Sequence, residues 1–259
     1  MRVVVFGAGG RMGAEVCRSV HADPDLELVG AVDPFHAGKD LRAVTGVHIP
    51  GMQISATPDE ISRTNPDVCV DFTHLEAAVP NILWCGENGV HCVVGTTGFS
   101  ETDLASITAA FTKSNCLIAP NFAIGAVLMM RFAEMAAPFF ETAEVIEFHH
   151  DQKIDAPSGT AMATVARMAA AKDAWAPDPT TKQLLDGARG GSGASGIRVH
   201  AVRMRGMVAH QEVILGTTGQ TLVIRHDTTD RTSFMPGVIL GVKKIADHAG
   251  VTMGLDSFL

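Results

Sequence analysis

The stretch "VVVFGAGGRMG", residues Val3 to Gly13, decides the fold. Its valines and phenylalanine favour a strand buried on both faces, and the residues from Arg11 onward favour a helix. The loop between them has a G-x-x-G-x-x-G spacing, because Met12 occupies the third glycine position of the commoner G-x-G-x-x-G pattern. Glycines here allow a tight turn and a close approach of the backbone to a pyrophosphate, which the helix N-terminus stabilises. A plain turn is the alternative.

Strand-like and helix-like segments alternate over roughly the first 122 residues, which predicts a parallel sheet with helices on both faces. A weaker strand candidate is "MQISA", residues 52–56. Pro80 lies within a helical run whose start it makes uncertain, since proline suits only a first turn. "LELVGAVD" is a strand that ends at Asp33, whose carboxylate can accept hydrogen bonds from a ribose hydroxyl.

Asp33 favours NADH, because its charge would repel the 2′-phosphate of NADPH. Arg11 could offset that repulsion, so NADPH remains open, and a simple turn acid before Pro34 is the alternative. Two further loops, "GTTG" at 95–98 and "APNF" at 119–122, follow strands of the same sheet. Ligands of open α/β sheets bind beyond the carboxyl ends of the strands, so the three loops together outline a cofactor site.

The pattern changes after residue 122. A long apolar helix at 125–140 is followed by the strand "AEVIEFHH", a helix from Ser158 and a Pro/Gly-rich segment, 176–196, which reads as a mobile lid or a disordered connection. Three strand-like runs follow without intervening helices, so we expect them to pair as an antiparallel sheet. They are residues 197–204, 210–217 and 220–227.

The fold class is therefore α/β: a Rossmann-type dinucleotide-binding domain plus an α+β substrate-binding and oligomerisation domain with a mainly antiparallel sheet. We assign residues 1–122 with 236–259 to the first domain and 123–235 to the second. In this assignment the C-terminal helix returns to the first domain, and "VTMGLDSFL" adds an edge strand.

Composition narrows the function classes. A hydrophobic content of 46% with 19% charged residues is that of a globular protein, and a formal net charge of −8 disfavours nucleic acid as a partner. No apolar run reaches the length of a membrane span. The five cysteines are an odd number without a C-x-x-C pair, which predicts buried, reduced thiols and a cytoplasmic location.

The stretch "EFHHDQKIDAPSGTA", Glu147 to Ala161, brings together bases and a helix start. Adjacent strand residues point to opposite faces, so His149 and His150 should diverge, and we predict no metal site. Hydride addition to a conjugated C=C–C=N system requires an acid, which a histidine can supply near neutral pH, with Lys153 as a second proton source or cation. Ser158 is a suitable N-cap, and the N–H groups of the following turn suit a carboxylate. Solvated histidines beside an ordinary helix cap are the alternative.

These motifs resemble those of the 4-hydroxy-tetrahydrodipicolinate reductase (dihydrodipicolinate reductase) family of lysine and diaminopimelate biosynthesis. The resemblance covers nearly the whole chain, through "FGAGGRMG", "VVGTTGF", "APNFAIG", "EVIEFHHDQKIDAPSGTA", "RMRGMVAHQEVILG" and "IRHDTTDRTSFMPGV". It implies NADH- or NADPH-dependent reduction of a small cyclic dicarboxylate by a homotetramer whose two domains close over substrate.

The resemblance also implies residue roles. His149 would be the catalytic proton donor/acceptor and Lys153 a proton donor. His150 would contact the substrate, and Gly159 and Thr160 would bind a substrate carboxylate. The residues implied for NAD(P)H binding are Gly7, Ala8, Gly9, Gly10, Arg11, Met12, Asp33, Gly95, Thr96, Thr97, Ala119, Pro120, Asn121 and Phe122. The basic residue that often follows the acid in this family is absent, since Pro34 follows Asp33.

Two other functions fit the sequence less well. A semialdehyde dehydrogenase would need an activated cysteine, and no cysteine follows the predicted cofactor domain. A redox sensor that binds NAD(P) without turnover would not need His149 and Lys153 beside an anion site. The late arginines, Arg198, Arg203, Arg205, Arg225 and Arg231, fit solvated or paired surface positions, and none is assigned a role.

Overall fold

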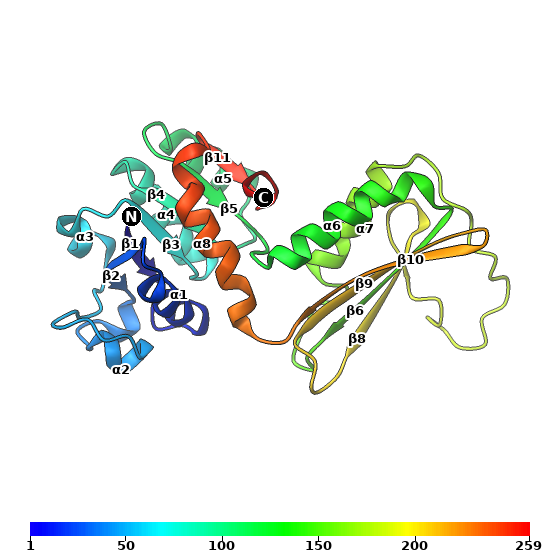
Figure 1. Cartoon of the computed structure of the whole chain (residues 1–259), viewed down its shortest axis with the longest axis horizontal. Helices are drawn as coiled ribbons and strands as arrows, with labels where there is room; N and C mark the ends of the chain where they lie inside the picture. Colours follow the sequence, from blue (N-terminus) through cyan, green and yellow to red (C-terminus); the bar gives the residue numbers. More distant parts are fainter. The chain divides into compact units, whose positions relative to one another are not determined.

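A computed structural model describes all residues, 1–259, as two units. Unit 1 comprises Met1–Phe122 and Phe234–Leu259, and unit 2 comprises Ala123–Ser233. Each unit contains one sheet with its own helices (Figure 1). No helix is long and apolar enough to cross a membrane.

Unit 1 is built on a six-stranded parallel sheet in the order β11-β5-β4-β3-β1-β2. Its strands are β1 (Arg2–Phe6), β2 (Glu27–Val32), β3 (Val68–Asp71), β4 (His91–Val94), β5 (Cys116–Ile118) and the edge strand β11 (Val251–Met253). Its helices are α1 (Arg11–Ala22), α2 (Leu41–Thr45), α3 (Pro58–Ile61), α4 (Leu75–Glu87), α5 (Glu101–Ala110) and α8 (Met235–Lys244). The predicted parallel α/β architecture and the C-terminal edge strand are confirmed.

Helices cover both faces of this sheet, which explains its continuous apolar strands. Helices α4 and α5 pack together on one face, where Ile82 and Ile107 join the core formed by strand residues such as Val4 and Val94. Helices α1 and α8 pack together on the other face, where Gly241 of α8 lies close to Leu117.

Two local expectations in unit 1 need adjustment. "MQISA" does not form a strand, because only Gln53 and Ser55 make isolated bridges, to Asp40 and Val32. Helix α4 begins at Leu75 despite Pro80 in its interior. Since Pro80 is exposed, water can satisfy the carbonyl that its missing N–H would have bonded.

Unit 2 contains a mixed five-stranded sheet in the order β10-β9-β6-β8-β7. Its strands are β6 (Thr142–His149), β7 (Gly191–Ser192), β8 (Arg198–Arg203), β9 (Ala209–Thr217) and β10 (Gln220–Thr228). Helices α6 (Ile124–Ala136) and α7 (Gly159–Ala170) contact each other and cover one face (Figure 1). The mostly antiparallel character predicted for this sheet is confirmed.

The predicted pairing of the three late strands is wrong in one respect. Strands β9 and β10 are antiparallel neighbours, but β8 does not pair with β9. Instead β6 lies between them, antiparallel to β9 and parallel to β8. The buried Val145 of β6 lies opposite Val199 of β8 and Val213 of β9, which are also buried, so the central strand packs its apolar residue against both neighbours.

The segment 176–196 carries no regular structure except β7 and a short 3-10 turn, Ala194–Gly196. Asp178 forms ion pairs with Arg189 (3.3 Å) and Arg198 (2.8 Å), and Arg189 also pairs with Glu144 of β6. Charged side chains therefore tie this segment to the sheet of unit 2.

Candidate functional site

The glycine loop between β1 and α1 is shaped by backbone contacts. Gly7 has a φ of +74°, and a Cβ on Gly13 would lie 2.0 Å from the carbonyl oxygen of Gly7, so neither position accepts a side chain easily. Gly10 is the N-cap residue of α1 and, as a glycine, has no side chain that could accept a hydrogen bond from the first turn. The first-turn N–H groups of a 12-residue helix therefore have no capping side chain, which suits an anionic group.

Asp33 lies beside this loop, at the carboxyl end of β2, and is only 6% exposed. One carboxylate oxygen accepts a hydrogen bond from the backbone N–H of Gly9 at 2.9 Å. The other accepts from the N–H of Phe35 at 3.0 Å and lies 3.1 Å from Nδ1 of His36. The contacts fix the carboxylate against the loop, while Arg11 is exposed and forms no ion pair.

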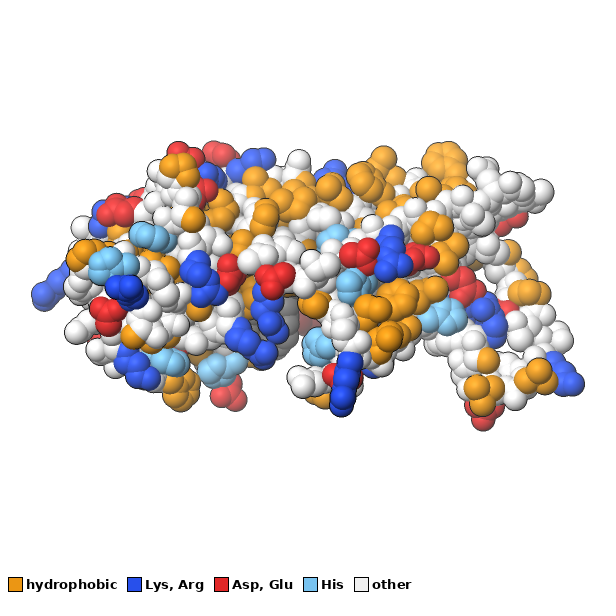
Figure 2. All heavy atoms as spheres, turned by 60° about the horizontal axis from the view of Figure 1, so that its bottom comes forward, with side chains coloured by type: hydrophobic (Ala, Val, Ile, Leu, Met, Phe, Trp, Pro, Cys, Tyr) orange, Lys and Arg blue, Asp and Glu red, His pale blue; other side chains and the backbone are white.

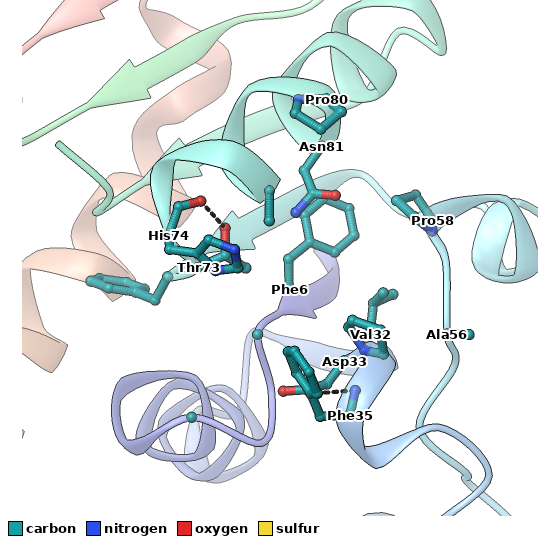
Figure 3. A pocket seen from close by; sticks show the side chains of 15 residues that line it. Phe6, Val32, Asp33, Phe35, Ala56, Pro58, Thr73, His74, Pro80 and Asn81 are labelled. Atoms are coloured by element: carbon teal, nitrogen blue, oxygen red, sulfur yellow. Dashed lines mark hydrogen bonds between the residues drawn. The ribbon is translucent and has the colours of Figure 1, made fainter. Parts of the chain in front are cut away.

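A cavity of about 410 Å³ opens beside the loop. Its lining includes Gly7 and Gly10 of the loop. Asp33 and Phe35 lie on one side, and Thr73, His74, Pro80 and Asn81 from the β3–α4 region lie on the other (Figure 3). Glycines, an acid and apolar surfaces are an appropriate lining for a dinucleotide.

Asp71, at the end of β3, organises the far side of this cavity and was missed by the sequence analysis. Its fully buried carboxylate accepts hydrogen bonds from the Thr73 N–H and hydroxyl, from Asn81 and from Thr96. The loop after β3 is thereby joined to the loop after β4. The available signal was an acid ending a buried strand in "DVCVDFTH", in the same position as Asp33 on β2.

The other candidate cofactor residues follow β4 and β5. A Cβ on Gly95 would lie 2.0 Å from the Phe72 ring, so this loop needs glycine for packing. Thr96 is buried, whereas Thr97 is exposed at the sheet edge. After β5, Ala119 and Phe122 are buried, Asn121 is half-buried and Pro120 is exposed. The exposed residues named at these two loops, Thr97 and Pro120, have short side chains.

In unit 2, His149 is the last residue of β6 and shares a face with Glu147, as strand alternation predicts. Its Nδ1 contacts Oε2 of Glu147, whose side chain is fully buried. Burial lowers the pKa of His149 below its ordinary value, although the Glu147 carboxylate opposes that shift. His150 lies beyond the strand and is exposed.

Lys153 and the start of α7 lie in the same motif. The Lys153 ammonium donates to both carboxylate oxygens of Asp155, at 2.7 and 2.8 Å, and its charge contributes to the lowered pKa of His149. Ser158 caps α7 by accepting from the N–H of Ala161, as predicted, so Gly159 and Thr160 form the first turn. Gly159 is exposed, with nothing within 4 Å of a Cβ at that position.

Arg203 of β8 completes this cluster and was set aside in the sequence analysis. Its two terminal nitrogens donate to the two oxygens of Glu147, at 2.9 and 2.8 Å. The parallel pairing of β6 with β8 places Arg203 directly opposite His149. Because that pairing was not predicted, the sequence offered no reason to prefer Arg203 over the other late arginines.

The five cysteines are free and buried. Burial raises the pKa of Cys17 to about 12, so its thiol is not activated. Over residues 1–259, no group of three or more histidine, cysteine or acidic side chains is arranged to hold a metal ion.

Comparison with known proteins decides the family. Two family models match: "Dihydrodipicolinate reductase, N-terminus" over residues 1–122 and "Dihydrodipicolinate reductase, C-terminus" over residues 125–259. The chain belongs to the dihydrodipicolinate reductase family. Members of this family are NAD(P)H-dependent oxidoreductases of lysine and diaminopimelate biosynthesis.

Individual relatives of this reductase family match over their full lengths. The 4-hydroxy-tetrahydrodipicolinate reductases of Corynebacterium urealyticum and Nocardia farcinica are each 48% identical, over 100% of this chain and 98% of theirs. A solved structure, dipicolinate-bound dihydrodipicolinate reductase from Paenisporosarcina sp. TG-14, is 38% identical with a TM-score of 0.87, over 100% of this chain and 99% of that one.

Proposed function

We propose that the chain reduces 4-hydroxy-tetrahydrodipicolinate to tetrahydrodipicolinate, with NADH or NADPH as hydride donor, uptake of one proton and loss of the 4-hydroxyl group as water. Family membership over both halves of the chain supports the reaction. The observation that carries the proposal is the cluster in unit 2, where a histidine held by a buried carboxylate shares one motif with Lys153 and the start of α7.

Unit 1 would hold the dinucleotide. The glycine loop fits it because its close backbone contacts leave no room for side chains and the start of α1 lacks a side-chain cap. Gly7 to Met12 would face the pyrophosphate, and Asp33 would accept from a ribose hydroxyl. The loops Gly95–Thr97 and Ala119–Phe122 would line the remainder. When bound, the reduced nicotinamide supplies the hydride.

Unit 2 would hold the substrate. His149, with Nδ1 engaged by Glu147, can exchange a proton at Nε2. Lys153 can give a proton or stabilise developing charge once its contact with Asp155 is exchanged for substrate. The first turn of α7 at Gly159 and Thr160, with His150, would bind a carboxylate. Dipicolinate, the ligand of the Paenisporosarcina relative, has the ring and two carboxylates that such a site requires.

The proposal includes a homotetramer formed through the uncovered face of the unit 2 sheet. Strand alternation places Phe148, Ile214 and Val223 on that face, and Val223 is 51% exposed. The Arg225 side chain, paired with Glu212 and Asp227, lies over the Phe148 ring. Figure 2 shows an apolar area here, bordered by acidic, basic and histidine side chains. An apolar centre with a charged rim is typical of subunit contacts.

A cytoplasmic location also belongs to the proposal. It is supported by five free cysteines, as expected for a reducing compartment.

The test is cofactor oxidation at 340 nm with freshly generated 4-hydroxy-tetrahydrodipicolinate, for the wild type, His149→Gln and Lys153→Ala. We expect substrate-dependent oxidation by the wild type and losses of about 10²–10⁴-fold for His149→Gln, the usual contribution of a positioned acid. Cofactor affinity, measured by fluorescence, should be unchanged in both variants. A folded wild type that binds NADH but does not oxidise it in the presence of substrate would contradict the proposal. It would favour the alternative of a redox sensor that binds NAD(P) without turnover.

A further inference from the structure

Glu147 is the most completely satisfied acid in unit 2, although its side chain is fully buried. One oxygen accepts from Arg203 (2.8 Å) and from the backbone N–H of Ser158 (3.2 Å). The other accepts from Arg203 (2.9 Å) and contacts Nδ1 of His149. Burying a carboxylate is costly unless it is paired and hydrogen-bonded, so this arrangement requires a reason beyond packing.

We propose that Glu147 is the positioning residue of the reductase site. It holds His149 in the tautomer with hydrogen on Nδ1, which leaves Nε2 as the atom that exchanges a proton with substrate. Through the N–H of Ser158, the same carboxylate fixes the turn from which α7 starts. One buried acid thus fixes the position of the proton donor, His149, relative to the turn at the start of α7 that would bind a carboxylate. This inference rests on the proposed function of the site.

Arg203 keeps the carboxylate in place. Its guanidinium grips both Glu147 oxygens and also donates to the backbone carbonyls of Asp155 (2.6 Å) and Val202 (2.9 Å). A planar guanidinium held at several points cannot rotate away, so the orientation of the carboxylate is defined. The interaction also links β8 to the loop that carries Lys153.

The charges around His149 determine the expected pH behaviour. Glu147 on β6 favours the imidazolium, whereas Arg203 on β8 and Lys153 on the loop disfavour it. Asp155 is paired with Lys153, and β9 contributes the neutral Gln211 opposite Glu147. Burial is the largest influence and lowers the pKa of His149. Removing the Glu147 charge should therefore lower this pKa further, because Glu147 is the group that favours the imidazolium, while Arg203 and Lys153, which disfavour it, remain.

The first experiment uses the unmodified protein. ¹⁵N NMR of histidine-labelled wild type, with His149→Gln for assignment, reports which ring nitrogen carries hydrogen in neutral His149. We expect the Nδ1–H tautomer. The Nε2–H tautomer, or a mixture of both as in free imidazole, would overturn the proposal without bearing on whether the protein is a reductase.

The second experiment is the pH dependence of kcat/KM for Glu147→Gln. We expect the limb that reports loss of the His149 proton to move to lower pH. We also expect activity at pH 7.5 to fall by about 10–100-fold, the range known for carboxylates that orient metal-bound histidines. KM for substrate should rise as well, because Ser158 loses a charged partner. A variant with a wild-type pH profile and KM would overturn the proposal.

Glu144→Gln is the matched control. Glu144 lies on the same strand and also pairs with an arginine and a histidine, Arg189 and His200, but on the opposite face. Its substitution should leave the pH profile in place. If Glu147→Gln does not fold, the NMR measurement of the His149 tautomer in the wild type tests the proposal by itself. If the wild type does not oxidise the cofactor, the proposed function fails, while the NMR result still tests the role of Glu147.

Discussion

The glycine loop of unit 1 and the Glu147 cluster of unit 2 are built in opposite ways. The loop is a contact of backbone with backbone within seven residues, exemplified by Gly13 against the Gly7 carbonyl. The cluster is a contact of side chains, in which Arg203 reaches Glu147 across 56 positions of sequence. A site made from local backbone can be recognised in a short run of consecutive residues. A site made from distant side chains depends on how the strands pair, which a short motif does not show.

Breaking the side-chain site should have the largest effect on stability. Arg203→Met leaves the Glu147 carboxylate buried without its counter-charge, which we expect to cost about 3–5 kcal/mol in the free energy of unfolding. Arg205→Met removes a similar ion pair, with Asp151, but the Arg205 side chain is 93% exposed, so its loss should be below about 1 kcal/mol. Denaturant unfolding of both variants measures the difference. Equal losses would show that the Glu147 cluster does not contribute specially to unit 2.

The unit 1 fold could be read from sequence because its signals are local. Apolar strand runs, glycine at the first turn and an acid ending "LELVGAVD" each predicted an element that the structure contains. The failure at "MQISA" has a local cause as well: its bridges to Val32 and Asp40 are isolated and do not extend into a ladder. Asp71 was overlooked because two of its partners, Asn81 of α4 and Thr96 after β4, are brought to it only by the fold.

In unit 2 the elements were predictable but their neighbours were not. The strand ending in the two histidines and the helix after Ser158 were both predicted, and Ser158 was correctly identified as a cap. The insertion of β6 between β8 and β9 was missed, because consecutive strands without intervening helices usually pair with each other. That single error concealed Arg203, which meets His149 only through the β6–β8 pairing.

Two glycines near helix starts, one in each unit, test whether the unit 1 loop depends on close backbone contacts and the unit 2 turn does not. Gly13→Ala in α1 would place a methyl 2.0 Å from the Gly7 carbonyl, so we expect a loss of about 1–3 kcal/mol in unfolding free energy and weaker NADH binding. Gly159→Ala in α7 meets nothing within 4 Å, so stability should stay within about 0.5 kcal/mol. Thermal and denaturant unfolding would measure both. A stable Gly13→Ala protein would contradict the backbone-built description of the loop.

Cofactor choice is the next smaller effect. Asp33→Ser removes the charge opposed to a 2′-phosphate, so the ratio of kcat/KM for NADPH to that for NADH should rise by about tenfold, or about 1.4 kcal/mol. Asp40→Ser is the control. Asp40, like Asp33, accepts a hydrogen bond from the backbone N–H two residues further on, here that of Arg42, but it lies outside the cavity lining. Steady-state kinetics with both cofactors gives the ratios. No change for Asp33→Ser would remove Asp33 from the ribose site.

The smallest expected effect is a difference in pH response between the units. Burial lowers the pKa of His91 in unit 1 and of His149 and His226 in unit 2. Between each lowered value and the ordinary 6.5, the unfolded chain binds more protons than the folded one, so stability falls as the pH drops through that window. Asp178, whose pKa is lowered to about 2, stays ionised throughout this pH window, so it does not contribute to the change in stability there.

Unit 2 contains two of these histidines and unit 1 contains one. Amide exchange at pH 7.5 and 5.5 should therefore show a greater loss of protection in β6 and β10 than in β4. His226→Gln should reduce the loss in unit 2, and an equal response of the two sheets would show that these histidines do not control it.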